Sequence, residues 1–330
     1  MSRKLLTLSL AATLMGGTAY ADTPQVAVDI APLHSLVARV MDGVGTPDLI
    51  VQPGASPHEY SLRPSEAAAL QNADLVFWIG PDLTPWLGDT IETLAPDAAV
   101  TTLLETDGTI ELEFREGALF EAHEHDEHGE EDGHEDHEEH ADEGHEDHGD
   151  EEAGHEGHDH GAHDPHAWLS PKNAMTWLNV IAGQLSAADP DNAGAYFANS
   201  AAGRTEIEAL IGEVTATLDP VRDGQFVVFH DAYQYFETDF DFPASGAISI
   251  GDASDPSPAR IAEIQGMIAE EGIDCVLAEP QFSASLVATV LDGTEAQTGI
   301  LDPLGSDLEP GPALYPQLIR NLSTALAGCM

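Results

Sequence analysis

Short apolar runs alternate with helical patterns along most of the chain, and this alternation constrains the fold more than any other feature. In the N-terminal half we predict strands at 26–30, 48–52, 73–80 and 99–104, with helices at 33–44, 64–73 and 84–95. A second alternation predicts strands at 225–230, 274–280 and 298–302 and helices at 258–272, 283–293 and 312–327. This order is typical of parallel sheets covered by helices on both faces. We therefore predict an α/β fold with two lobes.

A long segment without internal proline joins the two halves. Residues 189–218 are polar on one side and predict a single helix that bridges the lobes. The helix before it, at 170–187, has Ser170 as its predicted N-cap. The predicted domains are an N-terminal lobe at 22–188, a bridging helix at 189–219 and a C-terminal lobe at 220–330.

The first 21 residues, MSRKLLTLSLAATLMGGTAYA, have the parts of a secretory signal. Arg3 and Lys4 form a basic start, an apolar run follows, and Ala19-Tyr20-Ala21 forms a small-residue cleavage site. The apolar run is too short to span a bilayer, and no other segment is long and apolar enough to do so. The sequence therefore predicts a signal peptide at 1–21, a periplasmic protein and no direct membrane insertion.

Cys275 and Cys329 are the two cysteines of the chain. An oxidising compartment favours a disulfide between them, and two free thiols or a thiolate metal site are the alternatives. The disulfide would close a loop of roughly 54 residues and join the C-terminus to the last lobe. A loop of this length contributes about 4 kcal/mol in the chain-entropy account.

Acidic residues dominate the charge of the chain, which is formally −50 at pH 7. Such a protein repels nucleic acid and anionic membrane surfaces and attracts cations. The acidity is densest in residues 121–164, which include the stretch EDHEEHADEGHEDHGDEEAGHEGHDH. We call residues 121–164 the His-rich loop, and because it has too few apolar residues to pack a core, we expect it to be disordered without ligand.

Twelve of the sixteen histidines lie in the His-rich loop: His123, His125, His128, His134, His137, His140, His145, His148, His155, His158, His160 and His163. Their H-x-H and H-x-x-H spacings place two imidazoles within reach of one cation, beside many carboxylates. No position is fixed, so binding should be weaker than at a preformed site. The loop is expected to be an accessory zinc reservoir or a sensor of high zinc, with a solvated spacer as the alternative. Nickel also suits imidazole, so the loop does not by itself select zinc.

The remaining four histidines are His34, His58, His166 and His230. His58 and His230 lie at the carboxyl ends of predicted strands, one in each half, where ligands of open α/β sheets bind. His166 precedes a helix, whereas His34 follows a proline at a helix start and is interpreted as structural. Zinc commonly takes four ligands from imidazole, carboxylate and water. Three histidines with a carboxylate or water would therefore form a zinc site.

Four motifs carry a resemblance to a known family: PGASPHEYSLRPSEAAALQNADLVFWIGPDLTPWL, DPHAWLSP, VVFHDAYQYF and LDPLG. They resemble the zinc-binding subgroup of the cluster A-I solute-binding proteins, the periplasmic receptors of ABC-type metal importers. The resemblance implies a rigid bilobal fold with a metal site between the lobes and His58, His166 and His230 as ligands. It also implies an ABC-type zinc permease in the inner membrane as partner, and a disulfide like Cys275–Cys329.

The resemblance also bears on which metal is bound. Manganese-binding relatives have an acidic residue where His230 stands and use the carboxylate that matches Asp302. Three imidazoles therefore favour Zn²⁺ over Mn²⁺. The fourth position stays open between Asp302, a water molecule and Glu59. Asp231 is either an acceptor that orients a ligand imidazole or an exposed loop carboxylate.

Three function classes are compatible with a zinc site. A monomeric, non-enzymatic receptor that captures Zn²⁺ for the permease fits the two-lobed organisation best. A zinc hydrolase would need an open coordination position and a general base such as Glu59, but no H-E-x-x-H motif is present. A surface adhesin is a role credited to some relatives, but no lipid-attachment cysteine follows the cleavage site.

Overall fold

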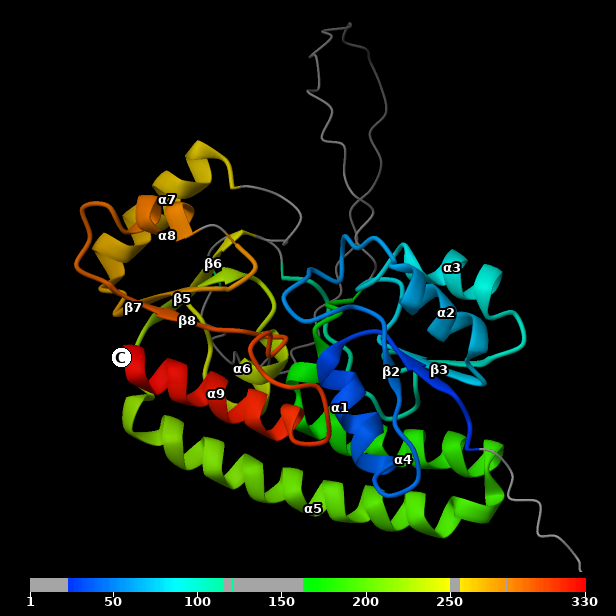
Figure 1. The fold of residues 1–330 in the computed structure, drawn as a ribbon. Helices are drawn as coiled ribbons and strands as arrows, with labels where there is room; N and C mark the ends of the chain where they lie inside the picture. The colour runs from blue at the N-terminus through cyan, green and yellow to red at the C-terminus, as the bar shows by residue number, and fades with distance from the viewer. Residues whose placement is uncertain (1–22, 116–119, 121–162, 250–255, 283) are drawn as a thin grey trace, which may run out of the picture.

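The computed structural model describes residues 23–115, 120, 163–249, 256–282 and 284–330. The predicted signal peptide and the whole His-rich loop except His163 and Asp164 lie outside the described residues. Within the described ranges, no helix is long and apolar enough to cross a membrane. The described residues form two α/β lobes that share one layer of long helices (Figure 1).

The N-terminal lobe contains a sheet of four parallel strands in the order β2-β1-β3-β4. The strands are β1 (Val26–Val28), β2 (Asp48–Leu49), β3 (Leu75–Trp78) and β4 (Ala99–Thr102). The helices of this lobe are α1 (Ala31–Val40), α2 (Pro64–Asn72) and α3 (Leu87–Leu94). The four strands predicted for this half are therefore confirmed, although β2 is only two residues long.

The C-terminal lobe repeats this topology with the strand order β6-β5-β7-β8, again all parallel. The strands are β5 (Phe226–His230), β6 (Gly246–Ser249), β7 (Cys275–Ala278) and β8 (Gln297–Ile300). The helices are α6 (Gln234–Phe240), α7 (Pro258–Glu271), α8 (Ala284–Leu291) and α9 (Leu314–Cys329). The strand β6 and the helix α6 were not predicted from the sequence.

Two long helices connect the lobes. The helix α4 (Pro171–Ala188) follows a 3₁₀ turn at Ala167–Leu169, and its N-cap is Ser170, whose Oγ accepts a hydrogen bond from the Asn173 N–H at 3.1 Å. The helix α5 (Ala193–Leu218) packs on α1, α4 and α9 and runs beneath both lobes (Figure 1). It begins later than predicted because Pro190–Asn192 form a separate 3₁₀ turn.

Alternation of side chains along the strands divides the core into layers. In β1, Val26 and Val28 face the common core, whereas Ala27 faces the layer covered by α2 and α3. In β5, Phe226 and Val228 face the same common core, whereas Val227 faces the layer covered by α7 and α8. This is the two-residue period of a strand buried on both faces. Because one continuous core joins both lobes, their relative placement is fixed by packing.

The predicted disulfide between Cys275 and Cys329 is confirmed. It joins the first residue of β7 to the last residue of α9, with Cα atoms 5.7 Å apart. Both residues are buried, at 0% and 5% exposure. The disulfide therefore anchors the C-terminal helix, which packs against α5 and α1, to a central strand of the second sheet.

The strand order creates one switch point in each sheet, at the carboxyl ends of β1 and β3 and of β5 and β7. Ligands of open α/β sheets bind at such points. In the first lobe the Asp29 side chain occupies this switch point. Its carboxylate accepts hydrogen bonds there from the backbone N–H groups of Ile30 (2.7 Å) and Ile79 (2.8 Å). In the second lobe, His230 ends β5 and Glu279 directly follows β7.

Candidate metal centre

A hollow lies where the two lobes meet. We call it the inter-lobe hollow, and its lining residues are Ser56, Pro57, His58, His166, Trp168, His230, Glu279, Gln281, Phe282, Pro303 and Leu304. The loop after β2, the 3₁₀ turn before α4 and the carboxyl ends of β5 and β7 all contribute. The hollow therefore brings together the three histidines that the sequence placed at loop positions, and it leaves out His34, whose Nε2 lies 3.0 Å from the Pro47 carbonyl oxygen.

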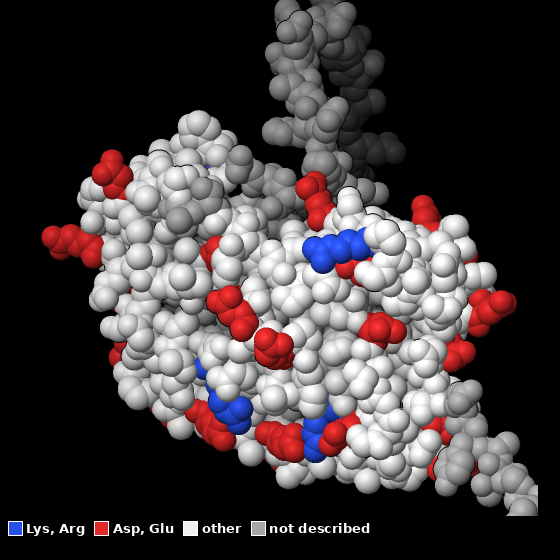
Figure 2. Space-filling model, in the orientation of Figure 1, with Lys and Arg blue, Asp and Glu red and all other residues white. Residues whose placement is uncertain are grey.

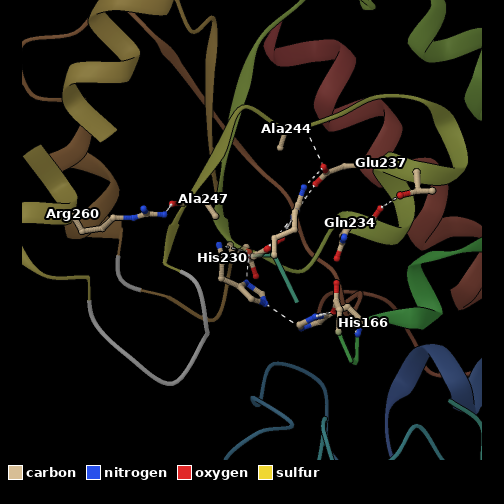
Figure 3. A network of polar contacts seen from close by, with 12 residues as sticks. His166, His230, Gln234, Glu237, Ala244, Ala247 and Arg260 are labelled. Carbon is tan, nitrogen blue, oxygen red and sulfur yellow. Dashed lines mark hydrogen bonds and ion pairs between the residues drawn. The ribbon is translucent and has the colours of Figure 1, made fainter. Parts of the chain in front are cut away.

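His166 and His230 face each other across the inter-lobe hollow (Figure 3). Their Nε2 atoms are 3.4 Å apart, and the two residues are only 5% and 4% exposed. A hydrogen bond between the two Nε2 atoms requires one ring to carry its proton on Nε2. A cation between them would instead satisfy both lone pairs at once.

Each of these imidazoles is held from behind by a buried carboxylate. The Nδ1 of His166 lies 2.7 Å from Asp164 Oδ1, and the Nδ1 of His230 lies 2.7 Å from Glu279 Oε1. The backbone N–H of His166 donates to the same Asp164 oxygen at 2.9 Å. Carboxylates in this position hold the proton on Nδ1 and leave Nε2 available to a metal.

Burial disfavours the ionised forms of Asp164 and Glu279. Burial raises the pKa of Asp164 to about 7, although the backbone N–H of His166 and the charges of Arg115 and His230 lower it. Burial also raises the pKa of Glu279, against the effect of His230. A cation on the far side of each imidazole would stabilise the ionised carboxylate behind it.

His58 comes from the N-terminal lobe, in the loop after β2, and is half-buried. Its ring centroid lies 5.7 Å from that of His166. Its loop is fixed by the Trp86 indole N–H, which donates to the Pro57 carbonyl at 2.8 Å, and the His58 N–H donates to Ser56 Oγ at 3.3 Å. His58 therefore lies at the rim of the His166–His230 pair.

The distance between the two facing Nε2 atoms is the one expected for two nitrogens bound to a single zinc ion. Two nitrogens that each lie 2.0–2.1 Å from a tetrahedral zinc ion are about 3.4 Å apart, which matches the distance between the two Nε2 atoms. Across the residues that the structure describes, no three His, Cys, Asp or Glu side chains are already close enough to enclose a metal ion. The structure therefore brings two of the three predicted ligands face to face, with the third beside them but not close enough to enclose an ion.

The two carboxylates that the sequence offered for the fourth position do not line the inter-lobe hollow. Asp302 accepts hydrogen bonds from the backbone N–H groups of Leu304 (3.0 Å), Gly305 (3.0 Å) and Ser306 (2.6 Å), so both of its oxygens are engaged by its own turn. Glu59 is exposed to solvent. Neither is positioned as a ligand in this structure.

Asp231 has neither of the two roles considered for it. It is buried, at 5% exposure, and its carboxylate pairs with the Arg115 guanidinium rather than with a ligand imidazole. Orientation of the imidazoles is instead supplied by Asp164 and Glu279, which the sequence reasoning missed. A usable signal was present, because Asp164 lies two residues before His166 and Glu279 lies near the carboxyl end of the strand predicted at 274–280.

Comparison with known proteins places the chain in a family. The family described as the periplasmic component A of the zinc-uptake complex, ZnuA, matches residues 26–329. The chain belongs to the ZnuA family. A ZnuA of Brucella abortus (strain 2308), named a high-affinity zinc uptake system protein, is 52% identical over 305 residues, which cover 92% of this chain and 91% of that protein. The protein of the same name from Paracoccus denitrificans is 48% identical over 313 residues, covering 94% and 93%.

Solved structures agree on the fold of this ZnuA family member. A crystal structure of ZnuA matches with a TM-score of 0.70 at 23% identity, covering 93% of this chain and 99% of the other. A zinc-bound ZnuA deletion mutant also has a TM-score of 0.70 at 23% identity, covering 93% and 98%. The predicted bilobal fold is therefore confirmed. The relatives named above are uptake proteins and not enzymes, which agrees with the non-enzymatic class predicted for this chain.

The surface of this ZnuA family member is strongly acidic. Figure 2 shows carboxylate side chains scattered over the visible face of both lobes, with few basic groups between them. This distribution agrees with the excess of sixty acidic over ten basic residues in the whole chain. A surface of this kind attracts cations over a distance and does not favour nucleic acid.

Proposed function

We propose that this protein captures Zn²⁺ in the periplasm, as a monomer exported by its signal peptide, and delivers it to an ABC-type zinc permease in the inner membrane. The observation that supports this most is the facing pair of His166 and His230, with each Nδ1 on a buried carboxylate. The names of the relatives support zinc as the cargo.

In this proposal His58, His166 and His230 are the protein ligands of the zinc ion. His166 and His230 form the preformed half of the site, and His58 joins them when zinc draws its half-buried ring inward. Water takes the fourth position, because Asp302 is engaged by three amides of its own turn and Glu59 is exposed. If His58 and water complete the site, zinc can be captured and released while the hydrophobic core between the lobes stays packed.

A chelator-competition titration of the metal-free mature chain, with Zn²⁺ against Mn²⁺, tests the proposal. One tight site that prefers zinc is the expected result, because three imidazoles suit zinc better than manganese. Manganese binding as tight as zinc binding would mean that carboxylates such as Asp302 or Glu59 dominate the site. The assignment of zinc as the transported metal would then be wrong.

The His-rich loop is proposed to hold additional zinc and to supply it to the inter-lobe hollow. Deletion of residues 123–162 should leave the tight site unchanged and lower the number of zinc ions bound per chain. His163 is kept in this variant because it is paired with Glu113 in the described structure. Isothermal titration of the deletion variant beside the full chain measures both quantities.

Two outcomes would contradict this role of the loop. Loss of the tight site in the deletion variant would mean that the loop supplies one of its ligands. An unchanged stoichiometry would leave the loop as a solvated spacer. A substitution of the eleven histidines from His123 to His160 with serine, at constant loop length and with His163 kept, is the matched control that separates loss of imidazoles from shortening of the chain.

A further inference from the structure

Residues 110–115, before the His-rich loop, pair with the last two residues of that loop, 163–164, and we call this two-stranded element the stem. Glu113 and His163 form an antiparallel bridge, and the Asp164 N–H donates to the Leu112 carbonyl at 2.8 Å. The stem begins in the N-terminal lobe, where the Ile110 N–H donates to Asn173 Oδ1 at 2.7 Å. Leu112, Asp164 and Arg115 also contact residues of the C-terminal lobe, so the stem spans the junction between the lobes.

Arg115 fastens the stem to the segment that follows His230. Its Nε lies 3.0 Å from both carboxylate oxygens of Asp231, and its Nη2 also donates to Asp231. Its Nη1 donates to Glu237 Oε2 at 2.7 Å and its Nη2 to Glu237 Oε1 at 3.1 Å. The guanidinium also stacks on the Phe120 ring, 3.5 Å from its centroid. One side chain therefore binds both the residue after His230 and the first turns of α6.

The charges make this contact specific for arginine. The side chains of Asp231 and Glu237 are each only 5% exposed, and that of Arg115 is 16% exposed. Two buried carboxylates without a cation would be strongly unfavourable, and the planar fork of arginine can pair with both of them. Burial opposes the charge of Arg115, but Glu237 and Asp231 outweigh that effect and raise its pKa. The guanidinium therefore stays charged.

The other strand of the stem holds the second imidazole. Asp164 ends this strand and binds both the Nδ1 and the backbone N–H of His166. Its remaining oxygen accepts a hydrogen bond at 3.2 Å from the Gln234 amide when that amide is oriented to donate, and the same amide nitrogen reaches the Glu113 carbonyl at 3.1 Å. Tyr235 also accepts from the Leu112 N–H at 3.0 Å and donates to the Asp164 carbonyl at 2.8 Å. Figure 3 shows Gln234 between Glu237 and His166.

We propose that the stem is the element that positions both facing imidazoles, with Arg115 as its main positioning residue. One strand fixes His166 through Asp164, and the other fixes the turn after His230 through Asp231. Arg115 touches neither the ion nor a ligand, and it acts by holding the two Nε2 atoms at their 3.4 Å separation. The inference rests on the zinc site proposed above.

The test compares the Arg115→Gln and Arg115→Lys variants of the mature chain with the wild type. Arg39→Gln is the matched control, because Arg39 also makes a two-point ion pair with a carboxylate, Glu206, and joins α1 to α5 away from the inter-lobe hollow. Zinc affinity is measured by chelator competition. The absorption spectrum of the Co²⁺-loaded protein reports the ligand geometry, and thermal unfolding of the metal-free form reports stability.

We expect R115Q to lose about 10-fold in zinc affinity, the lower end of the effect of removing a direct partner of a metal ligand, because Arg115 acts through other residues. Its Co²⁺ spectrum should also change in shape. R115K should lie between R115Q and the wild type, because it restores the charge but not the fork. R39Q should keep the wild-type affinity and spectrum even if its unfolding temperature falls.

Wild-type affinity and an unaltered Co²⁺ spectrum in R115Q would overturn the inference and leave Arg115 with a stabilising role alone. If R115Q does not fold, the R115K variant is used for the test. A wild-type zinc affinity and Co²⁺ spectrum in R115K would then overturn the inference. Absence of tight zinc binding in the wild type would instead defeat the proposed function, so the two failures are distinguishable.

Discussion

Replacement of His166 or His230 with alanine is expected to abolish tight zinc binding. Each ring supplies one of the two Nε2 atoms that face each other at 3.4 Å, and each has an Nδ1 already committed to a carboxylate. Loss of a direct ligand should cost more than the about 10–100-fold typical for loss of an outer partner. Replacement of His58 with alanine should also remove tight binding, because it deletes the proposed ligand from the loop after β2. Chelator competition on metal-free protein measures all three effects.

The control for this experiment is a buried imidazole outside the inter-lobe hollow. His34 in α1 is 5% exposed and contacts the Pro47 carbonyl, so His34→Gln tests loss of a buried histidine without loss of a ligand. We expect this variant to retain tight zinc binding. Weak binding by the His-rich loop should persist in every variant. Unaltered affinity in all three alanine variants would defeat the assignment of the site.

The arrangement of the two lobes could be predicted because the sheets are parallel and buried on both faces. Strands such as Leu75–Trp78 and Phe226–His230 then appear as continuous apolar runs between helical patterns. The strand β6 escaped prediction because its sequence, Gly-Ala-Ile-Ser, is short and contains three small residues. The helix α6 escaped because seven residues rich in aromatic side chains do not show a helical period.

The meeting of the three histidines in the inter-lobe hollow could be predicted because the carboxyl ends of strands are where such folds place ligands. The partners of these histidines could not, since Glu279 and His230 are 49 residues apart and meet only because β5 and β7 are neighbours in the sheet. Asp302 shows the opposite limit. Its position after the last strand suggested a ligand, but the hydrogen-bonding capacity of its carboxylate is taken by the N–H groups of the following turn.

The role of Arg115 also could not be predicted, because its partners are distant in the sequence. Arg115 follows no strand and belongs to no helix, and its importance depends on two carboxylates that lie 116 and 122 residues further along the chain. In a chain with ten basic residues, a buried arginine is nevertheless costly to keep without a role. Pairing between distant segments therefore defines the surroundings of the site, whereas local pattern defines the ligands.

Removal of the disulfide is expected to produce the largest loss of stability. The Cys275→Ala/Cys329→Ala double variant should unfold with a free energy about 4 kcal/mol lower, because the unfolded chain regains the entropy of a 54-residue separation. Denaturant unfolding of the metal-free protein, with the slope compared between variants, measures this change. The α9 helix should be the element most affected, since Cys329 is its last residue.

The double variant also deletes two buried side chains, so a second route to the same state is needed. Reduction of the wild type under the same conditions breaks the covalent link and leaves both sulfur atoms in the core, where Cys329 packs closely on Gly299. Equal losses in the reduced wild type and in the double variant would assign the effect to the link. An unfolding free energy unchanged by reduction would contradict the prediction. Zinc affinity should change little, because Cys275 begins β7 whereas Glu279 follows its opposite end.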